Sequence, residues 1–358
     1  MGKQQQIKEF LLDLKDKEGD AFVWNEEVLF AEIEQKTSNN STLAIKVLSI
    51  FGGLLATLAF LAFLFISGLN DSAFGLVFFG ILFIVLSIIG SKMYNRIVID
   101  TSAISLYTIG YALLAFGLSQ MHLEETLCCF LFIVIAFVAL NIVSSYVFSF
   151  ISFLIIFSSV IAIININDLY NAYHLITLVN AISLFYLFQY ESIIMVKFRK
   201  ISFHYEPLRI AMICSFIFML YLVSTGFIFH ISFSLSFISS IANILLISYF
   251  IYLAKETLNI VTNSVLIWTV LAVALLLSPT IYYPAISGSI LIMLCCFRSN
   301  YKTGFSIGVL SLIYFISQFY YDLYYTLLIK SILMFTIGII FLICYFITNK
   351  KLMNNENN

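Results

Sequence analysis

Long stretches of uncharged, apolar residues recur along this chain from residue 47 to residue 348, and they limit what it can fold into. Hydrophobic residues make up 62% of the 358 residues and charged residues only 10%, whereas a soluble domain is about half apolar and about a quarter charged. Helices that are apolar on every side belong in lipid or in the interior of a bundle. We therefore predict an all-α fold, a polytopic bundle of transmembrane helices.

The apolar stretches divide into about twelve segments, each near the roughly 20 residues that a helix needs to cross a bilayer. They run 47–67, 73–90, 101–119, 127–143, 147–164, 172–188, 207–227, 235–254, 264–278, 284–298, 303–320 and 326–348. The predicted organisation is a polar, helical head at 1–42, the transmembrane bundle at 43–348 and a short tail at 349–358.

All but one of the 18 lysines and arginines fall where a single topology places cytoplasm. Short loops that are rich in Lys and Arg stay in the cytoplasm, because basic residues resist translocation. The exception is Lys330. This distribution predicts a multi-pass protein of the bacterial inner (cytoplasmic) membrane, with the head, the tail and both termini in the cytoplasm.

Residues 127–164 are almost continuously apolar, and they fit either one long helix or a hairpin that turns at 144–146. One long helix would place the four basic residues between 197 and 209 outside the cell, against the distribution of the other basic residues. We therefore predict the hairpin. Eight of the 15 glycines lie between Gly52 and Gly117, and small residues let membrane helices approach closely, so the first three spans should pack tightly.

Polar side chains within the predicted spans are the candidates for a substrate path, because ionisable and polar groups are costly in a membrane. Lys330 could serve a substrate or an ion pair, with Asp322 on the same side, or it could extend to the outer headgroups. Asn180, Asn243 and His174 could line a solute path, or they could form hydrogen bonds between helices.

Two further groups of residues suggest binding to the membrane surface or to a cation. Lys197, Arg199, Lys200 and Arg209 have the charge to contact anionic lipid headgroups. His122, Glu124 and Glu125 in an external loop carry metal-ligand chemistry, but a solvated acidic loop is the preferred explanation, and we predict no metal site. No cofactor is expected. Membrane lipids are the expected partners, with a membrane-protein partner for residues 1–42 as an alternative and no nucleic acid.

Two segments carry a resemblance to a known family. They are Phe51–Ala56, with the sequence FGGLLA, and Ala103–Leu114, with the sequence AISLYTIGYALL. The chain resembles, mainly over residues 43–120, a family of bacterial multi-pass membrane proteins called domain of unknown function 4401. It departs from the family pattern at Tyr111, where Gln is usual, and it lacks a Trp after Gly53. The family has no established activity, so the resemblance implies no catalytic residues.

Three functions fit these observations. The first is transport or permeation of a small or amphiphilic solute, which the number of spans favours. The second is a non-catalytic structural or assembly subunit of a membrane complex, which the short loops and the few polar groups favour. The third is a membrane enzyme with a site on the outer face, for which the loops are short and acid–base pairs are sparse. We rank transport first, the subunit second and the enzyme last.

Overall fold

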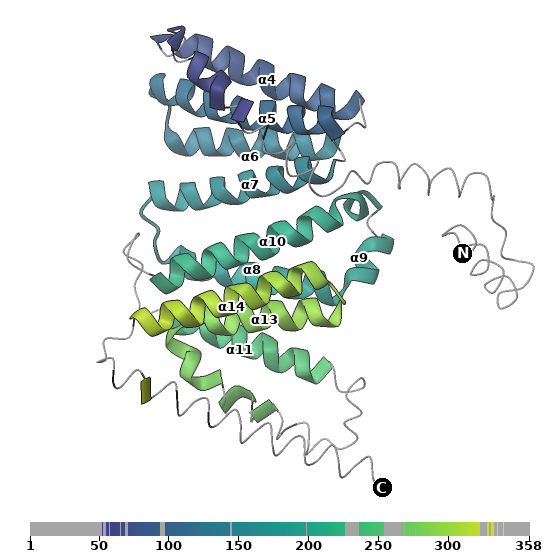
Figure 1. Cartoon of the computed structure of the whole chain (residues 1–358), viewed down its shortest axis with the longest axis vertical. Helices are drawn as coiled ribbons and strands as arrows, with labels where there is room; N and C mark the ends of the chain where they lie inside the picture. The colour runs from purple at the N-terminus through teal and green to yellow at the C-terminus, as the bar shows by residue number, and fades with distance from the viewer. Residues whose placement is uncertain are drawn as a thin grey trace, which may run out of the picture. The chain divides into compact units, whose positions relative to one another are not determined.

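The computed structural model of the chain describes residues 71–93, 97–143, 145–197, 199–225, 236–253 and 277–322, with scattered residues at 52–68, 267–275 and 328–339. Every regular element in these ranges is helical (Figure 1). The all-α prediction is therefore confirmed for this part of the chain. The predicted head and tail, Cys344 and Lys330 lie outside the described residues.

The chain divides into two compact units, residues 1–121 and residues 122–358. The first unit contains α4 (Ala73–Met93) and α5 (Ile97–Gln120). The second contains α6 (Glu125–Ile142), α7 (Tyr146–Ile166), α8 (Ala172–Gln189), α9 (Glu191–Lys197), α10 (Arg199–Thr225), α11 (Ser236–Leu253), the 3₁₀ helix η4 (Ser278–Tyr282), α13 (Pro284–Arg298) and α14 (Lys302–Asp322).

Seven helices in the described ranges are long and apolar enough to cross a membrane. They are α4, α5, α6, α7, α8, α10 and α14, whereas α11 and α13 are shorter apolar helices. Large apolar side chains face outward from them, among them Phe137, Leu175 and Leu310, each more than 60% exposed. Such a surface suits lipid. The total of about twelve spans and the orientation of the termini stay predictions.

In the first unit, α4 and α5 pack closely because glycines remove the side chains between their backbones. A Cβ atom at Gly110 would lie 2.6 Å from Cγ1 of Ile84 and 2.9 Å from the carbonyl oxygen of Gly80. A Cβ at Gly117 would lie 2.9 Å from the backbone nitrogen of Val77. The close packing predicted from the glycines is therefore confirmed for these two helices.

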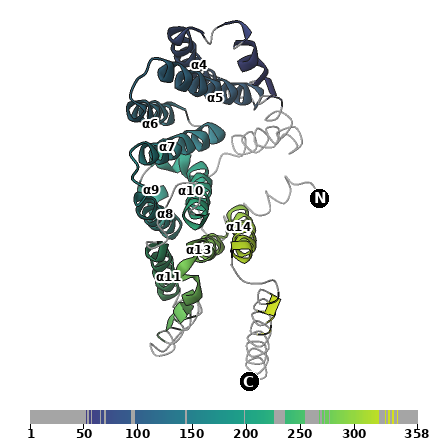
Figure 2. The ribbon, with the colours of Figure 1, turned by 90° about the vertical axis from the view of Figure 1, so that its left-hand side faces the viewer.

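In the second unit, the predicted hairpin between the fourth and fifth apolar segments is confirmed. Helix α6 ends at Ile142, and α7 begins at Tyr146. Val143 is extended, with φ −110° and ψ 127°, and so is Ser145, with φ −73° and ψ 139°. Helices α6 and α7 pack against each other, and they lie side by side in the two views (Figures 1 and 2).

The rest of the second unit is built around α10, which packs against α7, α8 and α13. Helix α11 packs against α8 and α13, and α13 packs against α14. The core between these helices contains Leu184, Phe216, Leu291 and Phe315, each at most 1% exposed. Helix α10 begins at Arg199 rather than at the predicted residue 207, so Pro207 lies inside it. This longer helix brings the residues before the predicted span into the bundle.

Candidate functional site

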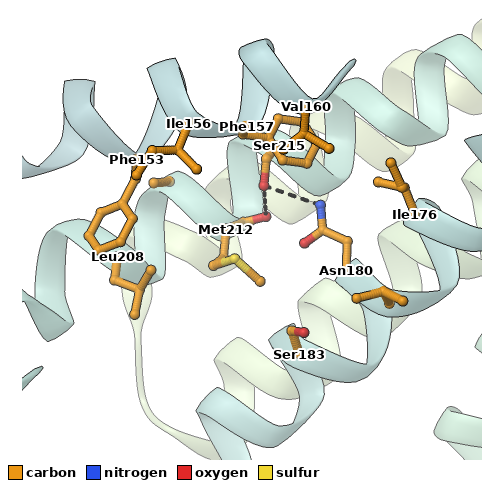
Figure 3. Close-up of a pocket in the computed structure, with 12 residues that line it drawn as sticks. Phe153, Ile156, Phe157, Val160, Ile176, Asn180, Ser183, Leu208, Met212 and Ser215 are labelled. Carbon is orange, nitrogen blue, oxygen red and sulfur yellow. Dashed lines mark hydrogen bonds between the residues drawn. The ribbon is translucent and has the colours of Figure 1, made fainter. Parts of the chain in front are cut away.

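A cavity of about 310 Å³ lies between α7, α8 and α10. Its walls are almost entirely apolar (Figure 3). The residues that line it are Phe153, Ile156, Phe157, Val160, Ile176, Val179, Asn180, Ser183, Leu208, Ala211, Met212 and Ser215. Its volume is at the low end of the range for small-molecule sites, about 300–1,000 Å³. We call it the α7–α8–α10 cavity. No charged residue is among those that line it.

Asn180 supplies the polar group of this cavity. Its Nδ2 donates a hydrogen bond to Oγ of Ser215 at 3.2 Å, and the Ser215 hydroxyl in turn donates to the carbonyl oxygen of Met212 at 3.0 Å. Asn180 is only 5% exposed. Its Oδ1 has no hydrogen-bond partner among the described residues. Figure 3 shows this oxygen turned away from Ser215, toward the middle of the lining residues.

The local sequence explains why Asn180 points inward. Buried residues on α8 recur at Tyr173, Thr177, Asn180, Leu184 and Leu187, three or four positions apart. This spacing places them on one face of the helix, so an amide at position 180 must lie within the protein rather than in lipid. Because α8 runs from Ala172 to Gln189, Asn180 also lies halfway along it.

A second cavity, of about 420 Å³, adjoins the first across the contact between α7 and α10. Phe157 and Ser215 line both cavities. The second cavity is otherwise lined by Ile151, Leu154, Ile155, Ser158, Ile161, Cys214 and Phe218. Phe157 and Ser215 therefore lie where the two spaces meet.

The other predicted path residues do not join Asn180 in its cavity. His174 lies 3.2 Å from Oγ of Ser239 through its Nδ1, which links α8 to α11. Asn243 donates from its Nδ2 to the carbonyl oxygen of Pro284 at 3.2 Å and approaches Oγ of Ser287 at 3.4 Å, which links α11 to α13. Both are buried. These contacts match the interhelical hydrogen bonding that the sequence left as the alternative.

The structure does not describe the side chains of the two charged candidates for a substrate path, Asp322 and Lys330. Asp322 is the last residue of α14, and its side chain lies outside the description. Lys330 lies outside it entirely. Their part in a substrate path stays a prediction.

Arg209 is buried and forms an ionic contact with a half-exposed carboxylate, which the sequence did not predict. Its side chain is 7% exposed, and NH2 lies 2.7 Å from both carboxylate oxygens of Glu206, with NH1 3.5 Å from Oε1 of Glu191. Its guanidinium carbon lies 3.6 Å from the centroid of the Tyr301 ring and 5.4 Å from that of Tyr205. We call these five residues the Arg209 cluster.

The Arg209 cluster changes the interpretation of the basic residues between 197 and 209. The guanidinium of Arg209 is held by carboxylates and aromatic rings inside the protein, rather than facing lipid headgroups. Lys197 ends α9 and is exposed, whereas the side chains of Arg199 and Lys200 lie outside the description. Lipid contact by these three stays a prediction. The spacing of Glu206 and Arg209, three residues apart on a helix, was the signal available in the sequence.

Helices from across the second unit meet at the Arg209 cluster. Glu191 begins α9, Tyr205 and Glu206 lie in the early turns of α10, and Tyr301 connects α13 to α14. Burial raises the pKa of the Tyr301 hydroxyl to about 12, with the neighbouring Tyr146 adding to the rise and the Arg209 charge opposing it. The cluster thus fixes one end of the bundle, and the Tyr301 hydroxyl in it stays neutral at neutral pH.

His122, Glu124 and Glu125, which lie between α5 and α6 and at the start of α6, show no metal-binding arrangement. His122 has a φ of 54°, in the left-handed region, between α5 and α6. Within the described ranges no group of three or more His, Cys, Asp and Glu residues could hold a metal ion. These three residues are therefore not brought together as a ligand set.

Seven apolar helices of membrane-spanning length, with apolar outward faces and polar contacts inside, define this chain as a helical membrane protein. The family model described as "Domain of unknown function (DUF4401)" matches residues 42–351, most of the chain. The protein therefore belongs to that family, and the resemblance expected from residues 43–120 extends almost to the C-terminus. No curated protein and no solved structure matches the chain.

Proposed function

We propose that this protein is a multi-pass protein of the inner membrane that transports a small amphiphilic solute, or lets it permeate, through the α7–α8–α10 cavity. The observation that carries the proposal is the unpartnered Oδ1 of Asn180, which is buried halfway along a membrane-length helix and lines an apolar cavity. A solute that crosses a bilayer needs a place for its polar group at that depth.

The energetics of this amide favour a ligand. A buried polar atom without a hydrogen bond costs about 1–3 kcal/mol, and buried polar groups in proteins are nearly always satisfied. A bound solute that donates to Oδ1 of Asn180 removes this cost, while its apolar part replaces empty space beside Phe153 and Phe157. The protein thus maintains a binding site at the expense of stability, as functional sites commonly do.

The route into the cavity runs from the lipid. Val179, which lines the cavity, is 53% exposed, and the outward faces of α7 and α8 are apolar. An amphiphilic molecule partitions into the bilayer through its apolar part, so its local concentration there exceeds that in water. Entry between helices therefore suits this class of solute better than entry through a water-filled mouth.

Transport is tested with the purified full-length protein in liposomes, by the exchange of radiolabelled ten-carbon amphiphiles that differ only in head group: decanol, decanoate and decylamine. We expect the protein to accelerate exchange of at least one of them over protein-free liposomes. The variant Val179→Trp, which fills the cavity from its exposed rim, should remove the acceleration. No acceleration for any of the three would overturn the proposal.

A non-catalytic subunit of a membrane complex is the second candidate, and one observation favours it. The contacts of His174 and Asn243 join α8, α11 and α13 through buried hydrogen bonds, and this part of the second unit has a tightly packed core. A rigid core of this kind suits a scaffold. Purification from native membranes with a single stoichiometric partner, together with no exchange activity, would favour this function over transport.

A further inference from the structure

We infer that the ligand of the α7–α8–α10 cavity is an uncharged amphiphile whose polar head is a hydrogen-bond donor, a medium-chain alcohol in its chemistry. This inference rests on the proposed function and names the class of solute. It is drawn from three features of the cavity: the polarity of the group that Asn180 presents, the absence of charge in the lining, and the volume.

The hydrogen bonds of Ser215 fix which atom of Asn180 is left for a ligand. The Ser215 hydroxyl donates its only hydrogen to the Met212 carbonyl at 3.0 Å, so toward Asn180 its oxygen can only accept. Asn180 therefore presents its NH₂ group to Ser215, at 3.2 Å, and turns its carbonyl oxygen toward the other lining residues, where it is buried, so that a rotation of the amide into the cavity is needed for a ligand to reach it. An amide oxygen accepts and does not donate. The ligand must accordingly supply the hydrogen.

A second polar group on α8, the hydroxyl of Ser183, favours a ligand that both donates and accepts a hydrogen bond over a ligand that only donates. Ser183 also lines the cavity and lies three residues after Asn180, on the same side of the helix. Its hydroxyl can donate to a ligand oxygen. An alcohol whose oxygen comes within hydrogen-bonding distance of both groups would donate to Oδ1 of Asn180 and accept from Ser183, which is exposed.

The lining excludes a charged head group. None of the twelve lining residues is Asp, Glu, Lys, Arg or His, and burying an ion without a partner costs far more than burying a hydroxyl. The nearest cation along α10 is Arg209, which follows Leu208, but its guanidinium lies against Glu206 and Tyr301. It therefore offers no counter-charge to an anionic head such as a carboxylate.

The volume sets the size of the apolar part. A water-sized group in a liquid occupies roughly 30 Å³, so about ten such groups of a ligand fit within the cavity of about 310 Å³, which is open on one side. The rings of Phe153 and Phe157 line this space, opposite Leu208 and Met212 of α10 (Figure 3). A ten-carbon alcohol fills it with its hydroxyl at Asn180.

The test is photocrosslinking of the full-length protein in phosphatidylcholine vesicles with a diazirine-bearing decanol. We expect the label in peptides from α7, α8 and α10, and we expect unlabelled decanol to displace it about two- to tenfold better than decane or decanoate, the range for one net hydrogen bond. Asn180→Leu should abolish the preference for decanol over decane while retaining labelling. Asn141→Leu is the matched control, because Asn141 is exposed and bonds only within α6, to the carbonyl of Phe137.

Equal displacement by decane and decanol would show that lipid chains simply fill the groove, and it would overturn the inference. So would stronger displacement by decanoate, or an unchanged preference in Asn180→Leu. Failure here is distinguishable from failure of the proposed function. If decanoate or decylamine is exchanged across liposomes and decanol does not bind selectively, transport stands and the ligand class is wrong. If decanol binds selectively and none of the three amphiphiles is exchanged, the ligand class stands and the transport function is wrong.

Discussion

Arg209 and Tyr301 form the closest cation–aromatic contact in the described part of the chain, with 3.6 Å between the guanidinium carbon and the ring centroid. Such contacts contribute about 2 kcal/mol or more when they are shielded from water. The contact joins α10 to the connection between α13 and α14. Since Glu206 holds the same guanidinium from α10 and Glu191 approaches it from α9, one side chain couples three parts of the second unit.

The first prediction concerns the stability of two variants of the Arg209 cluster, one that removes a negative charge and one that removes the positive charge. Glu206→Gln leaves Arg209 buried with only Glu191 at 3.5 Å, whereas Arg209→Met removes the buried charge and leaves Glu206, 53% exposed, to water. Glu206→Gln should therefore destabilise the protein more than Arg209→Met, by roughly 1–3 kcal/mol, less than for a fully buried pair because Glu206 is exposed. Thermal unfolding in detergent measures both. A larger loss in Arg209→Met would mean that the stacking on Tyr301 outweighs the charge.

The second prediction follows from the raised pKa of Tyr301. Burial raises this pKa from about 10 in the unfolded chain to about 12 in the folded protein, so the neutral hydroxyl is favoured by folding. The resulting stability is fully present below pH 10 and is lost as the pH rises to 12. Tyr301→Phe keeps the ring on Arg209 and removes the titration. The variant should lose less stability than the native protein over that interval. Subtracting the tyrosinate absorbance of Tyr301→Phe from that of the native protein during a pH titration isolates the ionisation of Tyr301, and this ionisation should occur above pH 10.

The third prediction concerns the close approach of α4 and α5. Gly110→Ala places a methyl group 2.6 Å from Cγ1 of Ile84 and 2.9 Å from the carbonyl oxygen of Gly80, so the helices must separate. Overpacking of this kind costs about 1–3 kcal/mol. Gly90→Ala is the control in α4, because the nearest atom to its Cβ is 4.0 Å away, and alanine favours a helix over glycine by up to about 1 kcal/mol. Thermal unfolding should separate the two variants, and equal behaviour would contradict the close packing.

The helices were largely predictable because lipid requires the same property of every span, a run of apolar residues about 20 long. The hairpin between Ile142 and Tyr146 followed from charge alone, since no turn residue marks it strongly. Helix ends were less predictable. Helix α10 begins at Arg199 and not at residue 207, where the predicted span begins, and the proline at 207 lies in an early turn of this long helix, which needs packing to support it.

The site was predictable only in part, because polarity in the sequence does not say which helices meet. Asn180, Asn243 and His174 have the same environment in the sequence, yet of the three only Asn180 lines the α7–α8–α10 cavity. Arg209 illustrates the reverse case. Its charge and its position beside other basic residues suggested the membrane surface, whereas its burial depends on Glu191 and Tyr301, which are 18 and 92 positions distant. Such contacts depend on tertiary packing and leave no local pattern.

The fourth prediction concerns topology, which the distribution of Lys and Arg assigns. Asp168 lies in the turn between α7 and α8, and Arg199 begins α10 at the other end of α8. A cysteine at position 168 should react with a membrane-impermeant maleimide in intact cells, and one at position 199 should react only after lysis. Position 168 has a φ of 53°, which Cys adopts less readily than Asp, so Asn167→Cys serves as a second external position. The opposite labelling pattern would reverse the assigned orientation.

The fifth prediction separates the two buried asparagines by their effect on stability. Asn243 holds α11 to α13 through the Pro284 carbonyl, so Asn243→Leu should cost about 1 kcal/mol, a typical value for hydrogen bonds between membrane helices. Both asparagines leave Oδ1 without a partner among the described residues, but Asn180 donates to one group, Ser215, which keeps its bond to the Met212 carbonyl, whereas Asn243 contacts two groups. Asn180→Leu should therefore cost less stability than Asn243→Leu. Thermal unfolding compares them, with Asn141→Leu as the exposed control. If Asn180→Leu were as destabilising as Asn243→Leu, Asn180 would be a structural residue, and the case for a ligand at its carbonyl oxygen would be lost.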